Sequence, residues 1–248
     1  PTAPSLGCRS RLEQPRAPKV HRGAGAGPEL PLALGARIAH EARMAELYGL
    51  PISPWTEKAR FALDHHRVPY RFRAYVPLLG EPLLRARLRR PLGRVSVPVL
   101  FCDAGAFADS FAIARHADRA GSGDPLVPDA SAADIGAWND RSETALQAGR
   151  ALTLGRLASS RGAREEALPA FVPGSARPVL DRVAKIGFGY VGAKYGVGRH
   201  DEGALRTLSA SLDALREALG GRPYLLDAFS YADVTMAAAL QFVRPVRE

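Results

Sequence analysis

The sequence predicts a small α/β domain followed by an all-helical domain. Three observations lead to this prediction. Strand-like and helix-like segments alternate through residues 44–120. A run rich in glycine, proline and serine follows at residues 121–130 and is typical of a linker. Across residues 131–248, the longer apolar patterns repeat at helical spacing.

The first strand is expected at residues 46–50, and a helix should follow it. Ser53 has the side chain of a good N-cap, and Pro54 fits the first position of a helix. The apolar residues that would form the buried face of this helix are Trp55, Ala59, Ala62 and Leu63.

The remaining elements of the first domain predict a mixed sheet. A second strand is expected at residues 70–76, a short basic helix at 82–90 and a hairpin of two strands at 97–108. A helix at 109–120 closes the domain. The resulting β-α-β-α-β-β-α order implies parallel pairing at first and antiparallel pairing in the hairpin.

The second half contains only helical patterns. Helices are expected at residues 131–157, 176–195 and 202–219, and a last helix should begin at Ser230. The helix at 202–219 carries leucines at alternating spacings of three and four, which indicates a packing surface. Ser230 and Asp233 have the spacing of a capping box.

Residues 1–43 differ from the rest of the chain. They contain 6 Pro and 5 Gly, with 7 Lys or Arg against 3 Asp or Glu, and we expect this leader to be disordered. A strand-like run begins directly after Met44, so one interpretation is that Met44 is the native start and the leader is not part of the native protein. The alternative is an arginine-rich targeting segment.

The net charge of +9 raises the question of nucleic acid or an anionic membrane surface. The leader accounts for +4 of it. Four further arginines cluster at residues 85–90, either as a solvated face or as a positive field for a small anion. No aromatic residues interleave with them, so nucleic acid is not an expected partner. No apolar stretch of about 18 residues exists, so no membrane partner is expected either.

Three short motifs carry the chemistry of the first domain. The string S-P-W-T-E-K-A-R at residues 53–60 lies where the first strand meets its helix. Val97-Pro98 opens the third strand, and Asp109-Ser110 begins the last helix. Each motif has a purely structural interpretation, as a helix cap or as a proline at a strand start. In a β-α-β-α-β-β-α layer, however, all three lie at the same edge of the sheet.

Together these motifs resemble the glutathione S-transferase superfamily over residues 45–248. The first string is similar to the serine-type, tau/zeta-like motif of that superfamily, and Val97–Leu100 looks like its V-P-x-L signature. Asp109–Ile113 looks like its E/D-S-x-A-I signature, and residues 221–233 resemble its helical-domain signature. The resemblance implies a thioredoxin-like N-terminal domain and a helical C-terminal domain.

The resemblance also implies roles for individual residues. Ser53 would donate a hydrogen bond to the glutathione sulfur and favour the thiolate. Val97, presented by a cis peptide bond to Pro98, would pair with the main chain of the cysteinyl part. Asp109 would hold the γ-glutamyl ammonium, and Ser110 would hold the γ-glutamyl carboxylate.

Two further residues complete the expected site. Arg94 is the candidate for the glycyl carboxylate, and Trp55 is the candidate for a wall of the electrophile pocket between the two domains. The resemblance implies glutathione as cosubstrate, no metal, a homodimer, a cytoplasmic location and a role in detoxification. Family members commonly continue beyond the helix that begins at Ser230, so we expect either a C-terminal truncation or an unusually open pocket.

The leading function is conjugation of glutathione to a small hydrophobic electrophile. Two alternatives stay open. The same site could serve a glutathione-dependent isomerase or lyase, which would regenerate glutathione. The chain could also be a non-catalytic member that binds ligands or partners.

Overall fold

The computed structural model describes residues 44–77, 79–90, 92, 95–166, 173, 175–195 and 202–243. The predicted leader at residues 1–43 therefore lies outside the described residues. The first elements are β1 (Ala45–Gly49), α2 (Pro54–His65), β2 (Tyr70–Ala74), α3 (Glu81–Arg87), β3 (Val99–Cys102), β4 (Gly105–Phe107) and α4 (Ser110–Ala120). Their order is the predicted β-α-β-α-β-β-α.

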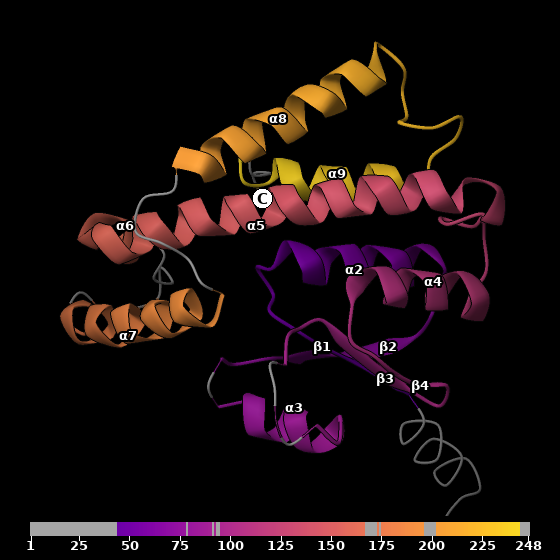
Figure 1. The fold of residues 1–248 in the computed structure, drawn as a ribbon. Coiled ribbons are helices and arrows are strands. Elements are labelled where there is room, and N and C mark those ends of the chain that lie inside the picture. The colour runs from indigo at the N-terminus through magenta and orange to yellow at the C-terminus, as the bar shows by residue number, and fades with distance from the viewer. Residues whose placement is uncertain are drawn as a thin grey trace, which may run out of the picture. The chain divides into compact units, whose positions relative to one another are not determined.

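The four strands form one mixed sheet in the order β2-β1-β3-β4. β1 runs parallel to β2, whereas β3 is antiparallel to both β1 and β4. Helices α2 and α4 cover one face of this sheet and α3 lies on the other face (Figure 1). The predicted thioredoxin-like layer is confirmed.

The register of the sheet brings three chain segments to one end. Tyr48 lies opposite Val99, so the residues that follow β1 are beside those that precede β3. Leu100 lies opposite Phe107, so the chain that leaves β4 returns to the same end. The turn into α2, the segment before β3 and the start of α4 are therefore neighbours.

The second half is helical, as predicted. Its elements are η1 (Asp129–Ser131), α5 (Ala132–Ser159), α6 (Arg161–Glu166), α7 (Arg177–Tyr195), α8 (Glu202–Leu219) and α9 (Tyr231–Leu240). Helix α5 packs against both α8 and α9. The two glycines after α8, Gly220 and Gly221, have φ angles of 50° and 85°, which end the helix at low steric cost.

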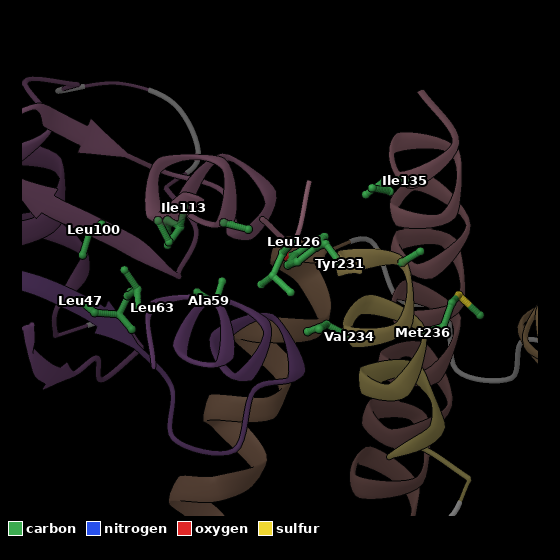
Figure 2. Packing of buried hydrophobic residues seen from close by; sticks show 14 of the residues in the cluster. Leu47, Ala59, Leu63, Leu100, Ile113, Leu126, Ile135, Tyr231, Val234 and Met236 are labelled. Carbon is green, nitrogen blue, oxygen red and sulfur yellow. The ribbon is translucent and has the colours of Figure 1, made fainter. Parts of the chain in front are cut away.

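One hydrophobic core joins the sheet to helices of both halves. Leu47 and Leu100 come from the sheet, Leu63 from α2 and Ile113 from α4 (Figure 2). The same cluster continues through the second half with Leu126, Ile135, Tyr231, Val234 and Met236. Burial of each large side chain contributes roughly 1.5–3 kcal/mol, so the shared core holds the two halves together.

Hydrogen bonds fix the segment between the two halves at Leu126 and Val127. The Asp118 carboxylate on α4 accepts the backbone N–H groups of Leu126 and Val127, each at 2.9 Å. The carbonyl of Leu126 in turn accepts the N–H of Tyr231 at 2.8 Å. The segment therefore connects α4 directly to the start of α9.

Helix α7 differs from a simple amphipathic core helix. Its apolar repeat faces solvent, because Val179, Val183 and Ile186 are 59–70% exposed. The helix packs against α5 and α6, and polar contacts also join it to its neighbours. Asp181 pairs with Arg164 of α6 at 2.6 Å, and the Tyr190 hydroxyl donates to Glu81 of α3 at 2.6 Å.

The predicted capping box of α9 is confirmed. The Ser230 hydroxyl accepts the N–H of Ala232, and one Asp233 oxygen accepts the N–H of Ser230 at 2.9 Å. The other Asp233 oxygen accepts the N–H of Leu225 at 2.9 Å. Asp233 thus fixes both the helix start and the loop that leads to it.

Removal of Asp233 should destabilise the protein more than removal of Ser230. Ser230→Ala loses one cap and should cost about 1 kcal/mol of unfolding free energy. Asp233→Ala leaves two partly buried amides without acceptors and should cost roughly 2–3 kcal/mol. Urea unfolding measures both, with Asp213→Ala in an exposed ion pair as the control. Equal losses for the two variants would contradict the double role of Asp233.

Candidate functional site

The turn between β1 and α2 presents Ser53. A Cβ atom at Gly49 would lie 2.5 Å from Cγ2 of Thr56, so glycine allows the buried Thr56 side chain to approach the strand end. Thr56 Oγ1 accepts the N–H of Leu50 at 3.2 Å, and the N–H of Ser53 donates to the Leu50 carbonyl at 3.0 Å. These contacts fix the backbone on both sides of Ser53.

The Ser53 hydroxyl is available to a ligand. Ser53 occupies the N-cap position of α2 with extended backbone angles, but its side chain makes no capping hydrogen bond. The residue is partly exposed, and its hydroxyl has no hydrogen-bond partner in the described part of the chain. It lies at the N-terminus of a 12-residue helix, where the helix dipole favours a negative charge.

The segment before β3 presents backbone groups. The predicted cis peptide bond between Val97 and Pro98 is confirmed. Pro98 is buried, whereas Val97 is partly exposed. Among the residues described, neither backbone polar group of Val97 has a hydrogen-bond partner. An extended peptide could pair with these groups as it would with a strand edge.

Asp109 caps α4. Its two carboxylate oxygens accept the N–H groups of Phe111 at 3.1 Å and Ala112 at 3.3 Å. The structural interpretation as an N-cap is therefore confirmed. Asp109 is also exposed, and a carboxylate has about four lone-pair sites, so it can accept a further donor from a ligand.

Ser110 lies behind Asp109 and is only 1% exposed. Its hydroxyl and that of Tyr231 are both buried without a hydrogen-bond partner in the described structure. Burial raises the pKa of Tyr231.

A buried lysine lies beneath the site. The side chain of Lys58 on α2 is 0% exposed, and its ammonium donates to Glu143 at 2.6 Å and to Thr235 at 3.1 Å. Asn139 Oδ1 lies at 3.5 Å from the same nitrogen. Burial lowers the pKa of Lys58, while the attraction of Glu143 and, more weakly, of Asp109 opposes this shift.

Trp55 lies one turn before this lysine. Its indole N–H donates to Oε2 of Glu143 at 2.6 Å, and the Arg150 guanidinium lies over the ring at 4.8 Å. Trp55 is partly exposed and contacts the second core cluster, around α5 and α8. The other predicted contact residue, Arg94, lies outside the described residues.

Two of the four arginines predicted as a cluster, Arg85 and Arg87, are held in ion pairs. Arg85 pairs with Glu81 at 2.7 Å. Arg87 pairs with Glu46, and its guanidinium lies 4.2 Å from the centre of the Phe101 ring. The Arg85 pair lies within α3, whereas Arg87 joins α3 to the sheet. Each charge is paired with a carboxylate, so these two side chains add little to a positive field.

Two kinds of site are not found in the described part of the chain. It contains no group of three or more His, Cys, Asp or Glu side chains that could hold a metal ion. Within the same residues, no helix combines the length and the apolar composition needed to cross a membrane.

Comparison with known families identifies the fold. The glutathione S-transferase N-terminal domain matches residues 47–125, and the glutathione S-transferase C-terminal domain matches residues 163–248. The chain belongs to the glutathione S-transferase superfamily. A comparison of the chain with curated proteins finds no match.

Solved glutathione S-transferases share this fold at low sequence identity. Glutathione transferase GSTFuA2 from Phanerochaete chrysosporium is 19% identical, with a TM-score of 0.58 over 82% of this chain and 86% of that one. A glutathione S-transferase of Ceriporiopsis subvermispora in complex with glutathione is also 19% identical, with a TM-score of 0.53 and the same coverage. A glutathione S-transferase domain-containing protein from Marinobacter aquaeolei VT8 is 22% identical, with a TM-score of 0.54 over 80% and 86% of the two chains.

Sequence reasoning did not single out Lys58, Glu143 and Tyr231, which the structure places near the candidate site. One signal for Lys58 existed, because it lies four residues before Ala62 on the predicted buried face of α2. Glu143 lies in the middle of a long helix with no cap, turn or motif around it. Only its hydrogen bonds to side chains of α2 show that it contacts Trp55 and Lys58.

The depressed pKa of Lys58 should make stability depend on alkaline pH. The folded state binds this proton less tightly than the unfolded chain, so the unfolded state holds more protons just below the ordinary pKa of 10.5. The unfolding free energy should therefore rise with pH through that window. Lys58→Met should lack this rise.

Denaturant unfolding of both proteins between neutral pH and pH about 10 measures the difference, because the other titrating groups are shared. The stability of the wild type relative to Lys58→Met should increase with pH. Parallel curves would show that the folded state does not depress the pKa of Lys58.

Proposed function

We propose that the chain is a glutathione transferase that activates the glutathione thiol for attack on a small hydrophobic electrophile. The observation that carries this proposal is the gathering of four groups at one end of the sheet. These are the free hydroxyl of Ser53, the unpaired backbone of Val97, the exposed carboxylate of Asp109 and the N-terminus of α4 at Ser110.

The chemistry of these groups matches that of glutathione. The Asp109 carboxylate would bind the γ-glutamyl ammonium through a charge-assisted hydrogen bond. The γ-glutamyl carboxylate would meet the free N–H of Ser110 at the start of the 11-residue helix α4. The cysteinyl backbone would pair with Val97, next to Pro98, and the thiol would then lie near Ser53.

Ser53 would favour the thiolate over the thiol. A hydrogen bond from its hydroxyl and the N-terminus of α2 both stabilise negative charge, and so lower the thiol pKa from about 8.5. The thiolate sulfur would form the new bond to the electrophilic carbon, while the leaving group takes the electron pair of the bond that breaks. Holding the two reactants together supplies the rest of the acceleration.

The solved structures support glutathione as cosubstrate. The Ceriporiopsis subvermispora protein is in complex with glutathione. A glutathione S-transferase from Methylobacterium radiotolerans, with a TM-score of 0.52 and 16% identity, is in complex with glutathione sulfonate.

Further details belong to the same proposal. We assign the chain to the serine-type, tau/zeta-like group because Ser53, with its free hydroxyl, would be the thiol partner. Residues 44–120 would form the glutathione-binding domain, 121–130 the linker and 131–248 the helical domain. Trp55 would line the electrophile pocket, and Arg94 would bind the glycyl carboxylate. The protein would be a cytoplasmic homodimer that acts in detoxification.

Ser53→Ala should separate chemistry from binding. Because the Ser53 side chain caps nothing, its removal should change the unfolding free energy little. Conjugation of glutathione to an activated aryl chloride should fall roughly a hundredfold, as when one donor to a developing anion is removed. Retention on immobilised glutathione should stay the same. Unchanged turnover would rule out the assigned role.

The same assays separate the alternatives. A folded wild-type protein that is not retained on immobilised glutathione would overturn the proposed function and favour a non-catalytic binding protein. Retention with turnover but without net consumption of glutathione would instead favour an isomerase or lyase.

Asp109 should show two separable roles. Asp109→Asn keeps one of the two capping acceptors and should cost only about 0.5 kcal/mol of unfolding free energy, yet it removes the charge that binds the ammonium. Glutathione affinity should fall about tenfold or more. Asp109→Ala should lose the same affinity and also about 1 kcal/mol of stability. Calorimetry of glutathione binding and urea unfolding measure the two effects. Full affinity in Asp109→Asn would exclude the ligand role.

A further inference from the structure

Trp55 is held from two sides. It lies in the first turn of α2, the helix that begins directly after Ser53, and it packs against the second core cluster around α5 and α8. The indole N–H donates to Glu143 at 2.6 Å, and the Arg150 guanidinium lies over the ring at 4.8 Å. Both partners come from α5, in the other half of the chain. The orientation of the indole therefore depends on a contact between the halves.

The Glu143 carboxylate serves two donors. Its Oε2 accepts the Trp55 indole N–H, and its Oε1 accepts the Lys58 ammonium, each at 2.6 Å. The Glu143 side chain is 28% exposed, so the carboxylate lies at the rim of the interface between α2 and α5. A carboxylate with both oxygens engaged cannot rotate without breaking a charge-assisted hydrogen bond.

Lys58 holds this carboxylate in place. Its own side chain has no exposed surface, and its other contacts are Thr235 on α9 and Asn139 on α5. The three acceptors match the three N–H donors of an ammonium. The core fixes Lys58, Lys58 fixes Glu143, and Glu143 fixes the indole.

We propose that Glu143, locked by Lys58, is a positioning residue that sets the indole of Trp55 as a wall of the electrophile pocket. This proposal rests on the proposed function. Glu143 would then affect the binding of the electrophile and not the binding of glutathione. The groups proposed for glutathione, Asp109 and Val97, make no hydrogen bond to Glu143 in the described structure.

Glu143→Gln tests this role. The new amide can accept from only one of the two donors, and its NH₂ group then faces the other donor. The KM for an activated aryl chloride should rise about tenfold, as expected for the loss of one charge-assisted hydrogen bond. The KM for glutathione should stay within about twofold. Trp55→Phe, which removes the same N–H, should give a similar change, and the double variant should add little to it.

The matched control is Glu57→Gln. Glu57 is also an acidic residue near Trp55 in sequence, but it pairs with Arg60 at the surface, where both side chains are about 40% exposed. Exposed pairs of this kind contribute little. Both KM values should therefore equal those of the wild type.

A second readout does not need activity. Trp138 is the other tryptophan of the chain, so Trp138→Phe leaves Trp55 as the single indole. In that background, Glu143→Gln should increase quenching of Trp55 fluorescence by acrylamide, while Glu57→Gln should not. Circular dichroism checks that the variants remain folded.

The outcomes separate the two proposals. Unchanged quenching and an unchanged electrophile KM in Glu143→Gln would overturn the role of Glu143. Equal increases in the KM values for glutathione and the electrophile would do the same, because they would indicate a general loss of structure. If the wild type conjugates nothing, the proposed function and the pocket role fail, whereas the quenching still reports whether Glu143 fixes the indole.

Discussion

A positive charge buried between the two halves of the chain sets how they fit together. An unpaired ammonium in this position would cost several kcal/mol, so Lys58 requires acceptors at defined places around it. Glu143 and Asn139 on α5 and Thr235 on α9 meet that requirement. These contacts therefore favour the observed arrangement of α2 against α5 and α9. Because α2 begins next to Ser53, the same constraint positions the proposed thiol site relative to the helical half.

The proposed glutathione side of the site depends on a different principle, because groups that stabilise the fold there can still bind a ligand. Asp109 uses both oxygens to cap α4, yet it remains exposed and has lone pairs to spare. Ser53 occupies a cap position without capping, so its hydroxyl stays free. The N-termini of helices thus provide hydrogen-bond donors and acceptors in fixed positions. The sheet register places two of them, those of α2 and α4, close together.

Much of the fold could be predicted from the sequence because its signals are local. The S-x-x-D spacing at Ser230 predicted a capping box within one turn, and the β-α-β-α-β-β-α order followed from alternating patterns. Helix α7 shows where this fails. The spacing of Val179, Val183 and Ile186 predicts a helix but not its partner, and these residues face solvent. Contacts such as that between Tyr190 and Glu81, 109 residues apart, are set by packing and leave no pattern in the sequence.

The two halves of the candidate site differ in the same way. The bonds that shape Asp109 reach two and three residues along the chain, so a short motif contains them. The bonds that hold Trp55 and Lys58 to Glu143 join residues 88 and 85 positions apart. A substitution in α5 can therefore alter the proposed wall of the electrophile pocket while every motif that resembles the family stays intact. For this reason the sequence motifs led to glutathione as the proposed cosubstrate, whereas the contacts of Trp55 required the packed structure.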